Sequence, residues 1–173
     1  MALSKEYSFK GVRTRVINQY RKHANHMTKG EKYRCSILLK KALNDKGISL
    51  SKHCKERGTI VPMTQVIQTI LSKSLLYHVI EYNEASVDGK WWTQRVLFEI
   101  PKPMFYFCTR RNKKCLGKLK IVYDITKGVI ITAYYNDVND NHDNLKEEFY
   151  HSDMYVRDYR VNGYNSKNHS IKD

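Results

Sequence analysis

Residues 119–135 read LKIVYDITKGVIITAYY. β-branched and aromatic side chains fill both halves of this stretch, and such residues favour β-strands. The four residues that join the halves, Ile125-Thr126-Lys127-Gly128, look like a hairpin turn. The stretch therefore predicts two antiparallel strands, which indicates a meandering sheet rather than alternating βαβ units.

Three segments before this hairpin have the same composition, namely residues 76–83, 92–100 and 104–108. A second turn-like sequence, Val87-Asp88-Gly89-Lys90, joins the first two of them. We therefore expect residues 75–136 to form a meandering antiparallel sheet of about four strands.

Residues 1–74 instead predict helices. Residues 7–27 carry apolar side chains at roughly helical spacing on a very basic background, which indicates a basic amphipathic helix. Thr28 followed by Glu31 is a capping box that opens a second helix, and Gly47 ends it. The predicted buried face of this helix consists of Cys35, Leu38, Leu39, Ala42 and Leu43.

Two further helices are predicted before the sheet. We expect Ser49 to cap a short helix that carries residues 52–57 and that Gly58 closes. Pro62 stands near the start of the next helix. The apolar residues of this helix are Val66, Ile67, Ile70 and Leu71.

The composition fits one folded domain. Of 173 residues, 41% are hydrophobic and 12% aromatic, with only 8 Gly and 3 Pro, which excludes collagen-like, low-complexity and fully disordered proteins. The elements predict one α+β domain over residues 1–136, with N-terminal helices (1–74) packed on the antiparallel sheet (75–136). Residues 137–173 are predicted to form a polar, partly disordered C-terminal extension.

Neither a membrane span nor a leader is predicted. No window approaches 18 consecutive apolar residues, and residues 1–10 lack the apolar centre of a signal peptide. The four cysteines show neither CxxC spacing nor the density of a disulfide framework. We therefore expect a monomeric cytoplasmic protein with reduced thiols.

The charge indicates a polyanionic partner. The formal net charge is +14; residues 1–60 carry 15 Lys and Arg against 4 acids, and residues 108–120 carry six basic residues and no acid. A single basic run is usually a solvated face. Two separate runs favour a surface that follows nucleic-acid phosphates. Residues 137–158 reverse the sign, with seven acids.

Metal-dependent nucleases need clustered carboxylates, which the predicted ordered part of this chain lacks. Residues 137–148 match four positions of a calcium loop. However, His142 stands where glycine must turn the chain, and Asn144 stands where an apolar residue anchors the loop. We therefore expect no metal site and no cofactor.

RNA cleavage without a metal needs a base, an acid and fixed cations around the phosphate. His53 and Arg57 lie four residues apart, so they share a face of the predicted short helix, with Lys52 and Lys55 nearby. A single helical histidine is more often an ordinary surface residue. The pairing with Arg57 favours a functional role.

The strands supply further candidates. Alternation puts His78 on the same face as Tyr82, where it is either catalytic or a buried core histidine. Thr132 and Tyr134 share one face of the last strand, and Tyr135 lies on the other. Such side chains hold a phosphate or stack a base, or else pack in the core.

Basic residues are predicted to position RNA. Arg95 lies on a mostly buried strand, so it needs an anion or a carboxylate partner. Cys108 and Cys115 bracket a basic turn that we interpret as a mobile RNA-binding finger. The other candidates in and after this turn are Arg110, Arg111, Lys113, Lys114, Lys118 and Lys120.

Short matches also carry a family resemblance: SKHCKER at 51–57, HVIEYNE at 78–84, KIVY at 120–123 and VIIT at 129–132. Together with the order of elements over residues 30–135, these matches make the chain resemble the RegB-type endoribonucleases of T-even-type phages. More broadly, the layout is similar to that of the RelE, YoeB, barnase and colicin-type ribonuclease toxins, in which helices pack on a four-stranded antiparallel sheet.

The resemblance implies a sequence-specific, metal-independent endoribonuclease that cuts single-stranded, purine-rich phage early mRNA and leaves a 2′,3′-cyclic phosphate. It implies action in the bacterial host cytoplasm, with a host ribosomal protein as an assisting partner. His53 and Arg57 match the family's His-x-x-x-Arg pair. The second catalytic histidine has no match in the following helix, so His78 or Tyr134 would supply the second proton transfer.

Two other function classes remain open. A non-catalytic RNA- or DNA-binding regulator explains the charge equally well. An interaction protein that binds a host ribosome or polymerase component through the acidic residues 137–158 is the third class.

Overall fold

The computed structural model describes residues 3–9, 12–56, 61, 64, 78–87, 91–139, 150–152, 154 and 156. A turn of 3-10 helix (Ala24–His26) precedes the long helix α1 (Lys29–Lys46). None of the described helices is long and apolar enough to cross a membrane. The elements in chain order are β1 (Leu3–Phe9), β2 (Val12–His23), α1 (Lys29–Lys46), β3 (Ser49–Leu50), α2 (Lys52–Glu56), β4 (His78–Val87), β5 (Trp91–Glu99), β6 (Met104–Cys108), β7 (Lys113–Asp124) and β8 (Val129–Asp137).

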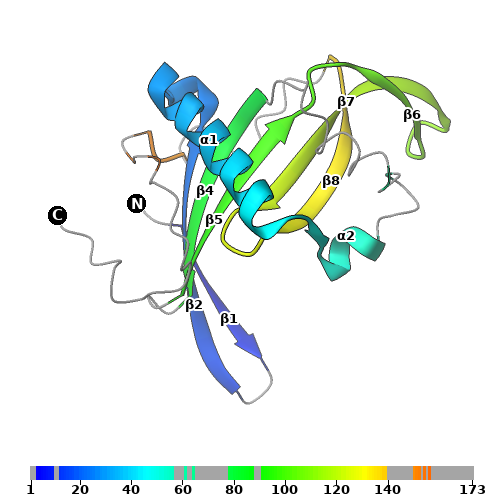
Figure 1. Cartoon of the computed structure of the whole chain (residues 1–173). Helices are drawn as coiled ribbons and strands as arrows, with labels where there is room; N and C mark the ends of the chain where they lie inside the picture. Colours follow the sequence, from blue (N-terminus) through cyan, green and yellow to red (C-terminus); the bar gives the residue numbers. More distant parts are fainter. Residues whose placement is uncertain are drawn as a thin grey trace.

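The described strands form one sheet in the order β1-β2-β4-β5-β7-β8-β3, with β6 paired to β7 outside this path. β3 runs parallel to β8, and the other described pairs are antiparallel. α1 lies across one face of the sheet (Figure 1). The predicted α+β class and antiparallel sheet are confirmed, whereas the prediction of about four strands was too low.

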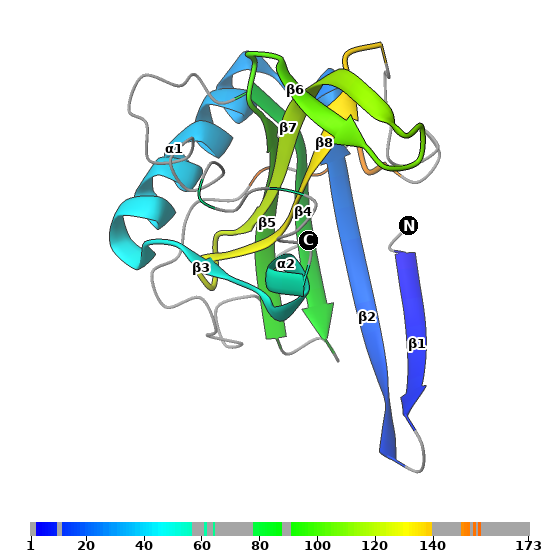
Figure 2. The ribbon, with the colours of Figure 1, turned by 90° about the vertical axis from the view of Figure 1, so that its right-hand side faces the viewer.

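The predicted N-terminal helix over residues 7–27 is wrong, because β1 and β2 occupy most of this segment. Its sequence also alternates with period two, since valine and threonine at 12, 14 and 16 are separated by arginines. β2 pairs with β4 from Ile17↔Val87 to His23↔Glu81. This pairing overrides a weak local helical preference. The β1–β2 hairpin extends past the other strands (Figure 2).

α1 has the caps that the sequence predicts. The backbone N–H of Glu31 donates to Thr28 Oγ1 at 3.2 Å, and the N–H of Thr28 donates to Glu31 Oε2 at 2.8 Å. Gly47 ends the helix with a φ of 68°, in the region that glycine tolerates best. Cys35, Leu38, Leu39 and Ala42 form the buried face, as predicted.

The hydrophobic core lies between α1 and the sheet. The hydroxyl of Tyr123 on β7 donates to the carbonyl of Gly47 at 2.8 Å, so the helix end is tied to the sheet. Val156 is fully buried in this core, although it belongs to the segment predicted as a C-terminal extension. The sheet side of the core includes Tyr82, Val96, Phe98, Leu119, Ile121, Ile130 and Ala133.

A short helix follows α1, as predicted, but a different serine caps it. Ser49 belongs to β3, whereas Ser51 Oγ accepts the N–H of Cys54 at 3.0 Å. α2 is therefore anchored beside β8, because Ser51 also donates its hydroxyl to the carbonyl of Ile131 at 2.8 Å. Most of the helix predicted after Pro62 lies outside the described residues.

Candidate active site

The face of the sheet turned away from the core is polar. Side chains alternate along each strand, so the neighbours of each core residue in the chain point to this face instead. In register, Asn83 of β4 lies opposite Arg95 of β5, and Arg95 lies opposite Asp124 of β7. We call this surface the polar face; the residues used below are Gln19, Arg21, His78, Glu81, Asn83, Arg95, Leu97, Glu99, Lys118, Lys120, Val122, Thr132 and Tyr134.

A β-bulge brings His78 to the polar face. The register between β4 and β5 shifts between Val79 and Glu81, so His78 lies opposite Glu99 and Glu81 lies opposite Leu97. The predicted alternation, which placed His78 with Tyr82, was therefore wrong, because the bulge inserts one residue and reverses the faces. The side chain of His78 is 64% exposed, so His78 is not a buried core histidine.

Glu99 contacts three charged or titratable groups on this face, where β5 ends and β4 begins. Its carboxylate lies 3.1 Å from Lys118 Nζ, 3.8 Å from Lys120 Nζ and 3.9 Å from His78 Nδ1. Glu99 is 8% exposed and Lys120 is 5% exposed. Two ammonium groups and one carboxylate leave this cluster with a net positive charge that favours an anionic ligand.

A cavity of about 130 Å³ lies beside the Glu99 cluster. Arg21 Nη1 lies 3.5 Å from Glu81, and Arg95 Nε lies 3.3 Å from the buried carboxylate of Asp124. Of the two partners predicted for Arg95, an anion or a carboxylate, the structure shows a carboxylate. The cavity is lined by Gln19, Arg21, Glu81, Asn83, Arg95, Leu97, Val122 and Tyr134.

Two buried polar atoms have no hydrogen-bond partner within the described part of the chain: Arg21 Nε and Thr132 Oγ1. Arg21 lines the cavity, and Thr132 lies opposite Val122, which also lines it. Buried polar groups are nearly always satisfied in folded proteins. Arg21 Nε is therefore an unsatisfied donor of a residue that lines the cavity, whereas Thr132 is only the strand neighbour of the lining residue Val122.

Tyr134 connects the cavity to the Glu99 cluster. It lines the cavity and lies opposite Lys120 in register. Directly opposed residues have Cβ atoms about 5 Å apart, so one ligand can reach both. Thr132 and Tyr134 share a face, as predicted, whereas Tyr135 packs against the core and stacks on Tyr106 with ring centroids 4.9 Å apart.

The structure does not bring the predicted His53 site together with this cluster. His53, Lys52 and Lys55 are exposed on α2 at the β8 edge, and β5 and β7 separate β8 from the strand that carries His78. Arg57 lies outside the described residues. The predicted basic turn lies at the tip of the β6–β7 hairpin, where Arg111 pairs with Asp137 at 2.8 Å.

Sequence reasoning missed Glu99, Arg21, Glu81 and Asn83. A signal for Glu99 was present, because Arg95 and Glu99 stand two positions on either side of Leu97 and therefore share its face. Arg21 was assigned to a helix, so its place beside β4 was not predicted.

Within the described residues, no group of three or more His, Cys, Asp or Glu side chains is arranged to hold a metal ion. The four cysteines are all free. Comparisons with protein-family models, curated proteins and solved structures found no match to this chain.

Proposed function

We propose that this protein is a metal-independent endoribonuclease and that the Glu99 cluster is its active site. The observation that carries the proposal is the buried carboxylate of Glu99 with His78, Lys118 and Lys120 around it, on a polar face beside a cavity. These are the groups that RNA transesterification requires: a base, an acid and cations at the phosphate.

In the proposed reaction, the Glu99 carboxylate accepts the proton of the ribose 2′-hydroxyl. The 2′-oxygen forms a bond to the adjacent phosphorus, and the bond from phosphorus to the 5′-oxygen breaks. Protonated His78 donates its proton to the leaving 5′-oxygen. The products are a 2′,3′-cyclic phosphate and a 5′-hydroxyl. Lys118 and Lys120 stabilise the negative charge that builds on the phosphorane oxygens.

The proposed substrate is single-stranded mRNA. The cavity is lined by the donors Arg21 and Asn83 and by the carboxylate of Glu81, which already contacts Arg21 and accepts from Tyr150. A carboxylate in the lining disfavours a phosphate and suits the edge of a base better. Tyr134 lies opposite Lys120, between the cavity, which would hold a base, and the Glu99 cluster, which would hold the phosphate. The purine-rich target, the early phage transcripts, the assisting ribosomal protein and the host cytoplasm are proposed from the resemblance to RegB-type enzymes.

A variant series tests the catalytic assignment. Single-stranded RNA is incubated in EDTA with wild-type protein, Glu99→Gln, His78→Ala and the matched control His53→Ala. We expect Glu99→Gln and His78→Ala each to slow cleavage by at least about 100-fold, while His53→Ala cleaves normally. Melting curves identify any loss of folding, since Glu99→Gln leaves the nearly buried Lys120 without its carboxylate.

The outcome also separates the competing function classes. Normal cleavage by Glu99→Gln would contradict the assignment of the base. Loss of cleavage in His53→Ala with normal cleavage by His78→Ala would return the site to α2. Tight RNA binding by wild-type protein without cleavage would instead support a non-catalytic nucleic-acid-binding protein.

A further inference from the structure

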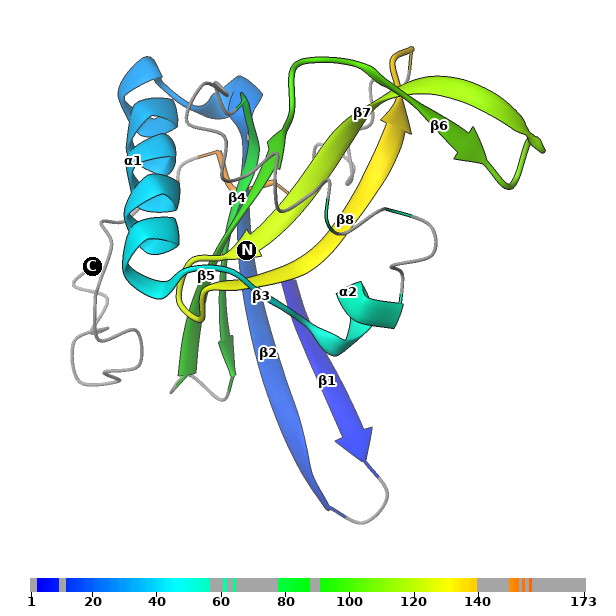
Figure 3. The same ribbon diagram turned by 45° about the vertical axis from the view of Figure 1, so that its right-hand side comes forward.

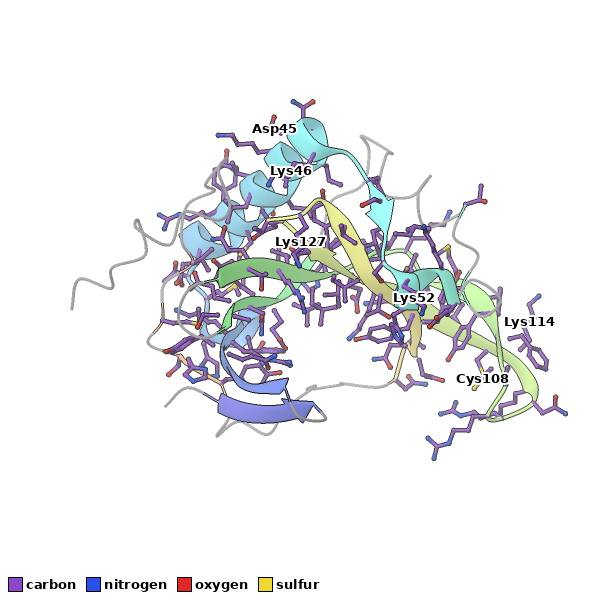
Figure 4. The ribbon with its side chains drawn as sticks, turned by 90° about the horizontal axis from the view of Figure 1, so that it is seen from below. Asp45, Lys46, Lys52, Cys108, Lys114 and Lys127 are labelled. Carbon is purple, nitrogen blue, oxygen red and sulfur yellow. The ribbon has the colours of Figure 1, made fainter. Side chains whose placement is uncertain are left out.

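The β6–β7 hairpin carries an exposed aromatic and basic surface. β6 pairs with β7 alone among the described strands, and the hairpin stands clear of both helices (Figure 3). Figure 4 shows Lys114 and Cys108 at this end of the sheet, away from Lys46 and Lys127. We call residues 104–117 the arm.

The two faces of the arm differ. On one face, Tyr106 stacks on Tyr135 of β8 with an interplanar angle of 9°, and Cys115 opposite Tyr106 is buried. Gly117 lets the Tyr106 ring lie close to the backbone of β7. A Cβ on residue 117 would stand 2.6 Å from the Tyr106 ring and 2.6 Å from the carbonyl oxygen of Asn136. This face fixes the base of the arm to the sheet.

The other face exposes large apolar side chains. Phe105 is 66% exposed, Phe107 is 58% exposed and Leu116 is 38% exposed. Phe105 lies opposite Leu116, and Phe107 lies opposite Lys114. Lys114 Nζ lies 4.8 Å from the centre of the Phe105 ring. We call Phe105, Phe107, Lys114 and Leu116 the arm surface.

The arm surface continues the polar face that holds the proposed active site. Lys114, Leu116, Lys118 and Lys120 occupy alternate positions of β7, so they share one side of the strand. Neither β5–β7 nor β6–β7 pairing shows a register shift. At about 3.3 Å per residue, these positions cover about 20 Å. A strand of nucleic acid bound at Glu99 can therefore extend along β7 onto the arm.

The chemistry of the arm surface fits bases and phosphates together. Flat exposed rings stack bases without regard to sequence. The tip adds Arg110, Arg111 and Lys113 to Lys114. Within the described residues, the acid that pairs with this group is Asp137, which lies 2.8 Å from Arg111. This positive charge complements a phosphate backbone and opposes a purely apolar partner.

We propose that the arm surface is a stacking platform for single-stranded RNA that flanks the cleavage site, with Phe105 and Phe107 each stacking a base. The proposal takes its substrate class from the proposed function. Binding on the arm does not require cleavage, so the two can be tested separately.

The test measures binding of a fluorescent single-stranded oligodeoxynucleotide, which lacks the 2′-hydroxyl and is not cleaved. Phe105→Ala/Phe107→Ala is compared with Tyr33→Ala, which removes an aromatic ring on α1 that is 69% exposed. We expect the double variant to bind at least about tenfold more weakly, with an unchanged salt dependence, and Tyr33→Ala to bind normally. Lys114→Gln should instead reduce the salt dependence.

A second variant distinguishes stacking from general apolar contact. Phe105→Trp/Phe107→Trp should keep the affinity, whereas Phe105→Leu/Phe107→Leu should lose it as the alanine variant does. Unchanged affinity in the alanine variant would overturn the proposal and leave the arm as a surface for a protein partner. Failure of wild-type protein to cleave RNA, with the alanine variant still impaired in binding, would overturn the proposed function and keep the arm proposal.

Discussion

Glu31→Gln should be strongly destabilising, because it breaks the buried ion pair that joins β2 to α1. Lys22 is 5% exposed and Glu31 is 7% exposed, and Lys22 Nζ lies 2.8 Å from Glu31 Oε1. Lys22 also donates to the carbonyl of Met154 at 2.7 Å. Glutamine retains an oxygen for the N–H of Thr28, so the cap survives while the charge is lost.

Removing one partner of a buried pair costs about 3–5 kcal/mol, because the other charge stays buried and uncompensated. For a chain of this size, each kcal/mol lowers Tm by about 2–4 °C. Glu31→Gln should therefore lower Tm by about 6–20 °C in thermal unfolding followed by circular dichroism.

The matched control is Glu56→Gln, which removes the exposed pair between Lys52 and Glu56 on α2. Exposed helical pairs contribute only about 0.3–0.5 kcal/mol, so Tm should move by less than 2 °C or so. Replacing both buried partners, as in Lys22→Met/Glu31→Leu, should recover most of the stability. Equal Tm shifts in Glu31→Gln and Glu56→Gln would refute this reasoning.

Three further predictions follow from the same structure. Burial tends to raise the pKa of Glu31, but the hydrogen bonds and the charge of its neighbours hold that pKa below the ordinary 4.5. The ion pair therefore stabilises the fold fully above pH 4.5, and the Tm difference between wild type and Glu31→Gln should shrink as the pH falls below 4.5. A Tm difference that stays constant with pH would contradict the prediction. Gly117→Ala should cost about 1–3 kcal/mol in urea unfolding, because its Cβ would meet Tyr106 and backbone, and an unchanged midpoint would count against this packing. Burial raises the pKa of Cys35 to about 12, so at pH 8 a thiol reagent should modify Cys108 much faster than Cys35, and equal rates would contradict the buried position of Cys35.

The sequence predicted the parts of the fold that local signals specify. β4 to β8 and α1 lie where β-branched runs, turn residues and a capping box indicated. The first strands were missed because residues 7–27 fit helical and strand periods about equally, and the choice is made by pairing with β4, some 60 residues away in the chain.

The site was predicted only in part. Thr132 and Tyr134 were found because alternation along β8 alone places them on one face. Arg95 was selected separately, as an arginine on a mostly buried strand that needs an anionic partner. His78 was selected but assigned to the wrong face, since a β-bulge leaves no mark in simple alternation. Alternation places Glu99 on the face of Arg95, but its contacts with His78 and Lys120 follow from the register, which is information about neighbouring strands rather than about one segment.

The end groups of the cleaved RNA test the central proposal most directly. Wild-type protein is incubated in EDTA with two single-stranded RNAs that differ by one 2′-deoxy substitution at the mapped cleavage site, and the products are analysed by mass. We expect a 2′,3′-cyclic phosphate and a 5′-hydroxyl from the all-ribose strand and no cleavage at the deoxy position. Cleavage at the deoxy position, or products ending in a 5′-phosphate, would contradict a reaction through the 2′-hydroxyl at Glu99.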